Sequence, residues 1–132
     1  MKPQIFLNFP ISDLAASIAF YEALGFVNNP SFSDETVKCM ALSEDFFVMC
    51  MTRERFLSFA TKPLADTKAT IAGLYSIGVD SLYTIHKLVD AAVMAGGKEI
   101  GELKDYGFMQ VRTVEDPDGH SWEVFFFDMS KM

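Results

Sequence analysis

The amino-acid sequence predicts an α+β fold built from two β-α-β-β-β modules. Two observations carry this prediction. The order strand, capped helix and three further strands occurs twice along the chain, and a repeated supersecondary unit indicates a duplicated architecture. Each predicted helix begins next to Asp or Ser and ends at Gly, which are the residues that helix termini prefer. We expect a single domain, residues 1–132, made of module 1–60 and module 68–132 joined by linker 61–67.

The first module begins with a predicted strand over Ile5–Phe9, and Pro10 suits a strand at the edge of a sheet. Ser12 or Asp13 then caps a helix that Gly25 ends. The buried side of this helix is predicted from apolar residues at helical spacing. These residues are Leu14, Ile18 and Tyr21.

Three short strands complete the first module. We predict them at residues 31–32, 37–42 and 46–51. Cys39 and Cys50 fall in the last two strands, and two cysteines do not make a disulfide framework. We expect both to be buried thiols in a reducing compartment. Residues 52–70 form a connector, whose first part is apolar enough for a short packed helix.

The second module repeats the pattern. A strand over 71–79 leads to Asp80 or Ser81, which caps a helix that Gly96 and Gly97 end. The buried face of this helix is predicted to contain Leu82, Ile85, Val89 and Ala92. Strands over 98–101, 108–114 and 121–127 follow.

The closing stretch, residues 115–127, contains the strongest candidate for a functional residue. Pro117 and Gly119 predict a turn, and an aromatic strand follows it. Side chains alternate along a strand, so Glu123 shares a face with Ser121, Phe125 and Phe127. A carboxylate among apolar neighbours is costly unless it is paired, bound to a metal or protonated. Glu123 is therefore a candidate catalytic or ligand-binding group.

Composition narrows the class of partner. The net charge is −7, and the sequence has no cluster of Lys and Arg of the kind that binds nucleic acid. An acidic protein does not suit anionic membranes either, and no apolar run is long enough for a membrane span. Without a signal-like start, we expect a cytoplasmic protein. The 13 Phe and eight Met indicate a large core, an apolar cavity or a subunit interface.

Two motifs resemble one known family. Asp13-Leu14, a spacer of small residues, Phe20-Tyr21 and Leu24-Gly25-Phe26 form the first motif. Asp116-Pro117-Asp118-Gly119, with Glu123 after three further residues, forms the second. Together with the repeated modules they resemble the glyoxalase / bleomycin-resistance / extradiol-dioxygenase superfamily, also called the vicinal oxygen chelate superfamily. The resemblance implies curled mixed sheets that together form a cup, and it implies a homodimer.

The resemblance also implies where a metal would bind. Metal-dependent members carry one ligand in the first strand and one in the last strand of each module. The matching positions here are Phe6, Phe47 or Met49, Leu74 and Glu123. Only Glu123 suits a hard divalent cation, so we expect a degenerate metal site and no cofactor. A slipped register, with Asn8, Ser76 and His120 beside Glu123, keeps a divalent metal as the alternative.

Other residues are candidates for the same pocket. His120 is either a general base near Glu123 or a surface imidazole at the strand start, and we favour the second. Tyr106 lies in a loop that either borders the pocket or caps the core. Arg112 either pairs with Glu123 or a ligand, or forms a structural ion pair, which we favour. His86 is predicted to be exposed on the polar side of its helix.

Three functions remain open. The first is a small-molecule binding protein of the glyoxalase/bleomycin-resistance type, whose ligand is unknown and either cationic or aromatic. The alternative is a metal-dependent lyase or dioxygenase of the same superfamily that uses Glu123. The third is a structural or regulatory dimer without a small ligand. Fold alone does not decide among them, and we favour the binding protein.

Overall fold

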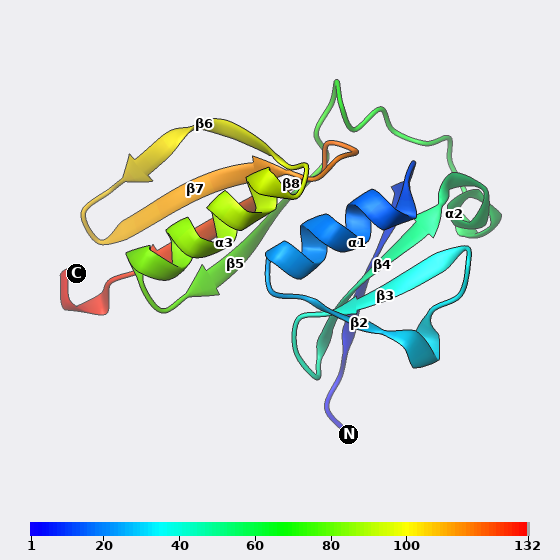
Figure 1. Ribbon diagram of the computed structural model, residues 1–132, viewed down its shortest axis with the longest axis horizontal. Helices are drawn as coiled ribbons and strands as arrows, with labels where there is room; N and C mark the ends of the chain where they lie inside the picture. Colours follow the sequence, from blue (N-terminus) through cyan, green and yellow to red (C-terminus); the bar gives the residue numbers. More distant parts are fainter. Residues whose placement is uncertain (132) are drawn as a thin grey trace. The chain divides into compact units, whose positions relative to one another are not determined.

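The computed structural model describes residues 1–131 and has an α+β fold with two four-stranded mixed sheets (Figure 1). This confirms the fold class that the sequence predicts. The chain divides into two compact units, Met1–Ala65 and Asp66–Met132, and each unit contains one of the sheets. None of the helices in residues 1–131 has the length and apolar character needed to cross a membrane.

The first unit contains one sheet with the strand order β1-β4-β3-β2, in which β1 and β4 run parallel and the other neighbours antiparallel. Its elements are β1 (Ile5–Ile11), α1 (Leu14–Ala23), β2 (Val27–Asn29), η1 (Pro30–Phe32), β3 (Val37–Ala41), β4 (Phe46–Thr52) and α2 (Arg53–Phe59). Pro10 lies in β1 at the edge of this sheet, as expected for a residue without a backbone N–H. The short helix predicted in the connector is α2.

Helix α1 begins and ends as the sequence predicts. The Asp13 carboxylate accepts a hydrogen bond from the Ala16 N–H at 3.2 Å. Gly25 adopts a φ of +101°, and the Phe26 N–H donates to the Tyr21 carbonyl at 2.9 Å, which closes a Schellman motif. The predicted buried stripe is wrong at two places, because Leu14 and Ile18 are only half-buried. The buried residues of α1 are Ser17, Phe20 and Tyr21.

The strand predicted at residues 31–32 is also wrong. These residues belong to the 3-10 helix η1, and the strand beside β3 is β2. The Asn29 side chain accepts a hydrogen bond from the Ser31 N–H at 3.1 Å, and Pro30 has the φ that a helical first turn needs. Local capping therefore decides the conformation of this segment.

The second unit repeats the topology, with the strand order β5-β8-β7-β6 and a parallel β5–β8 pair. Its elements are β5 (Leu74–Val79), α3 (Leu82–Met94), β6 (Lys98–Asp105), β7 (Met109–Glu115), β8 (Ser121–Phe127) and η2 (Met129–Lys131). Strand β5 is shorter than predicted and β6 is longer. The pairing of β6 with β7 shifts between Ile100 and Lys104, where Gly101 has a φ of +70°.

Helix α3 covers one face of this second sheet (Figure 1). Ser81 caps it by accepting a hydrogen bond from the Thr84 N–H at 3.1 Å. Ile85, Val89 and Ala92 are fully buried, as predicted, but Leu82 is 37% exposed because it lies in the first turn. The sheet side chains under α3 include Val114, Trp122 and Val124. Within residues 66–131, no α-helix covers the opposite face of the sheet, which we call the open face.

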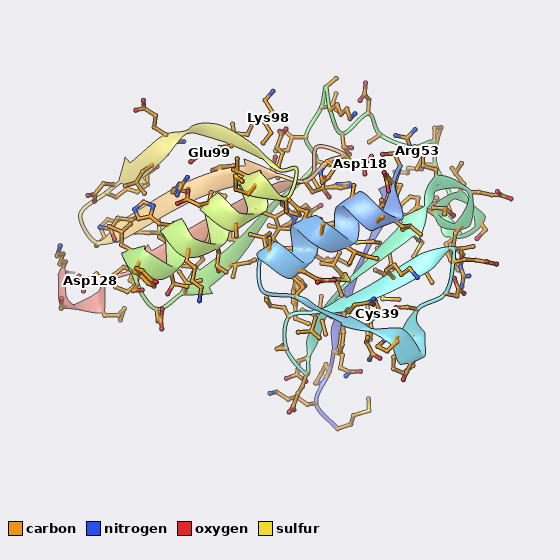
Figure 2. All side chains as sticks on the ribbon, in the orientation of Figure 1. Cys39, Arg53, Lys98, Glu99, Asp118 and Asp128 are labelled. Atoms are coloured by element: carbon orange, nitrogen blue, oxygen red, sulfur yellow. The ribbon has the colours of Figure 1, made fainter. Side chains whose placement is uncertain are left out.

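The two cysteines are buried and do not form a disulfide bond, as the sequence predicts. Cys39, labelled in Figure 2 on β3, is paired in register with Met49, and Cys50 lies one position further along β4. Neighbouring residues of a strand point to opposite faces, so the two thiols do not face each other. Burial raises the pKa of the Cys39 thiol, which disfavours the thiolate, the reactive form of cysteine.

Candidate functional site

Glu123 lies in the middle of β8, on the face of the sheet opposite α3. The register pairs it with Ser76 of β5 and Thr113 of β7. The Ser76 hydroxyl donates a hydrogen bond to one carboxylate oxygen of Glu123 at 3.0 Å. This bond orients the carboxylate and leaves its second oxygen available, since a carboxylate accepts several hydrogen bonds.

A hollow of about 520 Å³ lies on this open face. Its volume is within the range of roughly 300–1,000 Å³ that is usual for small-molecule sites. The lining residues are Ser76, Lys104, Tyr106, Phe108, Met109, Val111, Glu123 and Phe125. Most of them are apolar or aromatic, so the hollow combines one oriented carboxylate and one ammonium group with a large apolar wall.

A second hollow, of about 380 Å³, adjoins the first and shares two residues with it, Lys104 and Glu123. It is more polar. Besides the shared pair, its polar lining residues are Thr67, Lys68, Thr70, Thr113, Glu115 and Ser121. The open face therefore carries an aromatic compartment and a polar compartment, and Glu123 and Lys104 border both.

The closing turn fixes the start of β8. The buried Asp116 carboxylate accepts hydrogen bonds from the Asp118 and His120 N–H groups, both at 2.9 Å. Gly119 has a φ of +93° and faces the backbone of Thr67, whose carbonyl oxygen would lie 2.3 Å from an added Cβ. The Thr67 hydroxyl in turn donates to the Asp118 carbonyl. Only glycine fits this contact between the turn and residues 67–68.

The prediction of His120 as a surface imidazole is wrong, because the residue is only 7% exposed. The residue begins the strand, but the turn folds over it. Its alternative role as a general base beside Glu123 stays untested. Strand parity places His120 on the face opposite Glu123, and it lines neither of the two hollows.

Arg112 does not pair with Glu123, because it lies on the α3 face of the sheet, in register with Val124. It forms the structural ion pair that we favoured. Its guanidinium donates two hydrogen bonds to Glu99 of β6, both at 2.8 Å, and contacts Asp90 of α3 at 2.9 Å. These bonds lower the pKa of Glu99 and raise that of Arg112. Figure 2 labels Glu99 on β6.

His86 belongs to the same cluster, so the prediction that it is exposed is wrong. It is half-buried, and an Arg112 nitrogen lies 2.9 Å from its Nδ1. Since arginine only donates hydrogen bonds, His86 accepts through this nitrogen. The helical spacing placed His86 correctly on the flank of α3, but that flank contacts the long Arg112 side chain from the sheet.

The other predicted pocket residues divide between the two units. In the second unit, Ser76 and Tyr106 line the aromatic hollow and Leu74 lines the polar one. In the first unit, Phe6, Phe47, Asn8 and Met49 share one face of the sheet, and the rings of Phe6 and Phe47 stack with centroids 4.6 Å apart. Asn8 lines a separate hollow of about 480 Å³ together with residues of α2.

The donor atoms near Glu123 do not fit a divalent metal ion. Such an ion needs three or four oxygen, nitrogen or thiolate ligands, and the neighbours of Glu123 in the sheet offer only the hydroxyls of Ser76 and Thr113. Within residues 1–131, no three His, Cys, Asp or Glu side chains are grouped so that they could hold a metal. We therefore derive no chemistry through a metal ion.

Sequence reasoning missed several residues of the site. Lys104 was missed because the predicted strand ended at residue 101, within the segment where the pairing of β6 with β7 shifts. Phe108, Met109 and Val111 are in the predicted strand 108–114, but nothing in the sequence indicated which face they occupy. Phe125 was placed correctly on the face of Glu123, and alternation along β8 was the signal that placed it.

The comparisons agree with this architecture. A model of the Glyoxalase/Bleomycin resistance protein/Dioxygenase superfamily matches residues 5–124. No curated protein matches the chain. Among solved structures, a glyoxalase-related enzyme from Fulvimarina pelagi is 20% identical with a TM-score of 0.80, covering 96% of this chain and 88% of that one.

Two further structures have a similar fold. A hypothetical protein from S. aureus is 22% identical over 96% of this chain and 94% of its own, with a TM-score of 0.79. A glyoxalase/bleomycin resistance protein/dioxygenase family enzyme from Burkholderia phytofirmans is 19% identical over 92% and 96%, with a TM-score of 0.75. At these identities the similarity establishes the fold alone.

Proposed function

Because the chain belongs to the glyoxalase/bleomycin resistance protein/dioxygenase superfamily, we propose that it binds a small organic molecule on the open face of the β5–β8 sheet, without a metal ion. One observation carries this proposal. The hollow of about 520 Å³ on that face contains the carboxylate of Glu123, which the Ser76 hydroxyl orients. An apolar pocket with a few convergent polar groups is the usual form of a ligand site.

The lining favours an aromatic or cationic ligand. Tyr106, Phe108 and Phe125 offer ring faces and edges for stacking against a planar group. Glu123 offers a carboxylate for a protonated amine or a hydrogen-bond donor, and such charge-assisted bonds are stronger than neutral ones. The net charge of −7 would also attract a cation over a longer range.

The proposal is tested with a thermal-shift screen of metal-depleted protein against a panel of small aromatic amines and neutral aromatic compounds. A ligand that binds only the folded chain raises the melting temperature. Compounds that bind should lose most of their effect in Glu123→Gln and keep it in Glu102→Gln, a change on β6 outside both hollows. A panel without a single shift, or equal shifts in both variants, would refute the proposal.

A metal-dependent lyase or dioxygenase that uses Glu123 is the alternative. The bound ion would supply a Lewis acid for the substrate oxygen atoms, but the hydroxyls beside Glu123 are poor ligands for it. Metal analysis of the protein, purified without chelator, distinguishes the two functions. One bound transition-metal ion per chain that is lost in Glu123→Gln would favour the enzyme.

We further propose that the protein is a cytoplasmic homodimer. Cys39 and Cys50 are buried thiols outside any disulfide bond, which suits a reducing compartment. Several large apolar side chains are exposed in each unit, among them Val27, Phe32, Phe59 and Tyr83. Exposed apolar side chains of this kind are commonly buried when subunits associate.

A further inference from the structure

The two hollows on the open face differ in chemistry but meet at one pair of opposite charges. Glu123 and Lys104 line both of them. Rings of Tyr106, Phe108 and Phe125 lie on one side of this pair. Hydroxyl groups, such as that of Thr113, lie on the other side together with the charged residues Lys68 and Glu115. A ligand that fills the aromatic compartment therefore has its next atoms beside a carboxylate and an ammonium group together.

Both charges are available to a ligand. Within residues 1–131, the Ser76 hydroxyl is the side-chain partner of Glu123, and it occupies one of the two carboxylate oxygens. The Lys104 ammonium forms no salt bridge within the same residues. Neither group therefore has to break an ion pair before it binds a ligand. Each can pair with a charge of the ligand without losing an existing salt bridge.

From this arrangement we infer the ligand class. The site takes an amphoteric aromatic compound, in which a ring is joined to a carbon that carries a protonated amine and a carboxylate. The ring occupies the aromatic hollow, the amine contacts Glu123, and the carboxylate contacts Lys104. This inference rests on the proposed function, because it assigns a ligand class to the same face of the sheet.

The opposite charges of Glu123 and Lys104 make the site selective, because they change the affinities of singly charged and amphoteric compounds to different extents. An amine without a carboxylate is attracted by Glu123 but repelled by the Lys104 cation. An acid without an amine is attracted by Lys104 but repelled by the Glu123 carboxylate. Each singly charged compound is therefore penalised by one of the two residues, whereas the amphoteric compound satisfies both. The discrimination comes from the pair, not from either residue alone.

The test uses three probes with the same ring and a similar side chain: phenylalanine, phenethylamine and 3-phenylpropionate. Isothermal titration calorimetry of the full chain should show phenylalanine binding about tenfold more tightly than either of the others, since one good charge-assisted contact corresponds to roughly that factor. Glu123→Gln should bring phenylalanine to the level of 3-phenylpropionate. Lys104→Met should bring it to the level of phenethylamine.

Two matched variants serve as controls. Lys98→Met and Glu102→Gln change the same residue types on β6, outside both hollows, and should leave the order of the three probes unchanged. If phenethylamine binds as tightly as phenylalanine, the inference is overturned while small-molecule binding stands. If none of the probes binds and the thermal-shift panel is also empty, both the inference and the proposed function fail.

Discussion

At the scale of single residues, the orientation of Glu123 depends on the register of two strands. Ser76 lies directly beside it because β5 and β8 are parallel and paired at these two residues. A shift of one residue would turn Glu123 to the α3 face, where Val114 and Val124 are fully buried. The candidate site thus depends on the turn that sets where β8 begins.

That turn makes a prediction about Gly119. In Gly119→Ala, the new Cβ would lie 2.3 Å from the Thr67 carbonyl oxygen, and the residue would keep a φ of +93°. The backbone strain at residue 119 and the steric overlap with Thr67 should together lower the free energy of unfolding by about 3 kcal/mol. Urea denaturation followed by circular dichroism measures this change.

Gly107→Ala is the matched control. Gly107 has a similar φ of +84°, but an added Cβ meets nothing within 4 Å. Backbone strain alone should cost about 1 kcal/mol there. Equal losses in the two variants would mean that the contact with Thr67 contributes nothing to stability.

At the scale of secondary-structure elements, the Arg112 cluster joins α3, β6 and β7. Arg112 is 11% exposed and contacts Glu99 and Asp90. Its bonds with Glu99 hold the pKa of that carboxyl below its ordinary value of 4.5. A carboxyl with a lowered folded-state pKa stabilises the protein above its unfolded-state pKa, and this stabilisation is lost as the pH falls through the folded-state pKa.

The pH dependence of Glu99→Gln follows from this. At pH 7 the variant should be less stable than the parent chain by about 1 kcal/mol, since Glu99 is partly exposed and solvent screens the pair. The difference should shrink as the pH falls below about 4.5. Chemical denaturation at several pH values measures it, with Glu102→Gln as control. A difference that is independent of pH would contradict this role of the Glu99 carboxylate.

The two sheets repeat each other closely enough for their positions to be compared. Asn8 in β1 and Ser76 in β5 lie equally far before the N-cap residues Asp13 and Ser81. Their partners in the parallel strands are Met49 and Glu123. The repeat therefore has a carboxylate at this position in the second unit and a thioether, which is a soft ligand, in the first.

At the scale of the whole molecule, the repeated order of elements made the fold predictable. The N-cap residues and the glycines after each helix predicted the ends of α1 and α3 to within about a residue, because both are local sequence signals. The partners of Arg112 and His86 were not predictable, since they depend on register between strands and on helix packing. The hydrogen bond between Thr67 and the closing turn was also missed, because it joins residues far apart in the sequence.

A homodimer is the expected assembly. Light scattering at micromolar concentration should report twice the mass of one chain. The chain exposes several large apolar side chains, and a stable interface usually buries on the order of 1,600 Å² in total. A single species with the mass of one chain over the whole concentration range would refute this expectation.

Methionine methyl NMR tests most directly whether a small molecule binds the open face of the β5–β8 sheet. Met109 lines the aromatic hollow, whereas Met40 is fully buried in the first unit and Met94 is 88% exposed on α3. Added phenylalanine or phenethylamine should shift the Met109 methyl resonance and leave those of Met40 and Met94 in place. An unchanged Met109 resonance, with shifts at Met94 or at Met51 of the other hollow, would contradict the account.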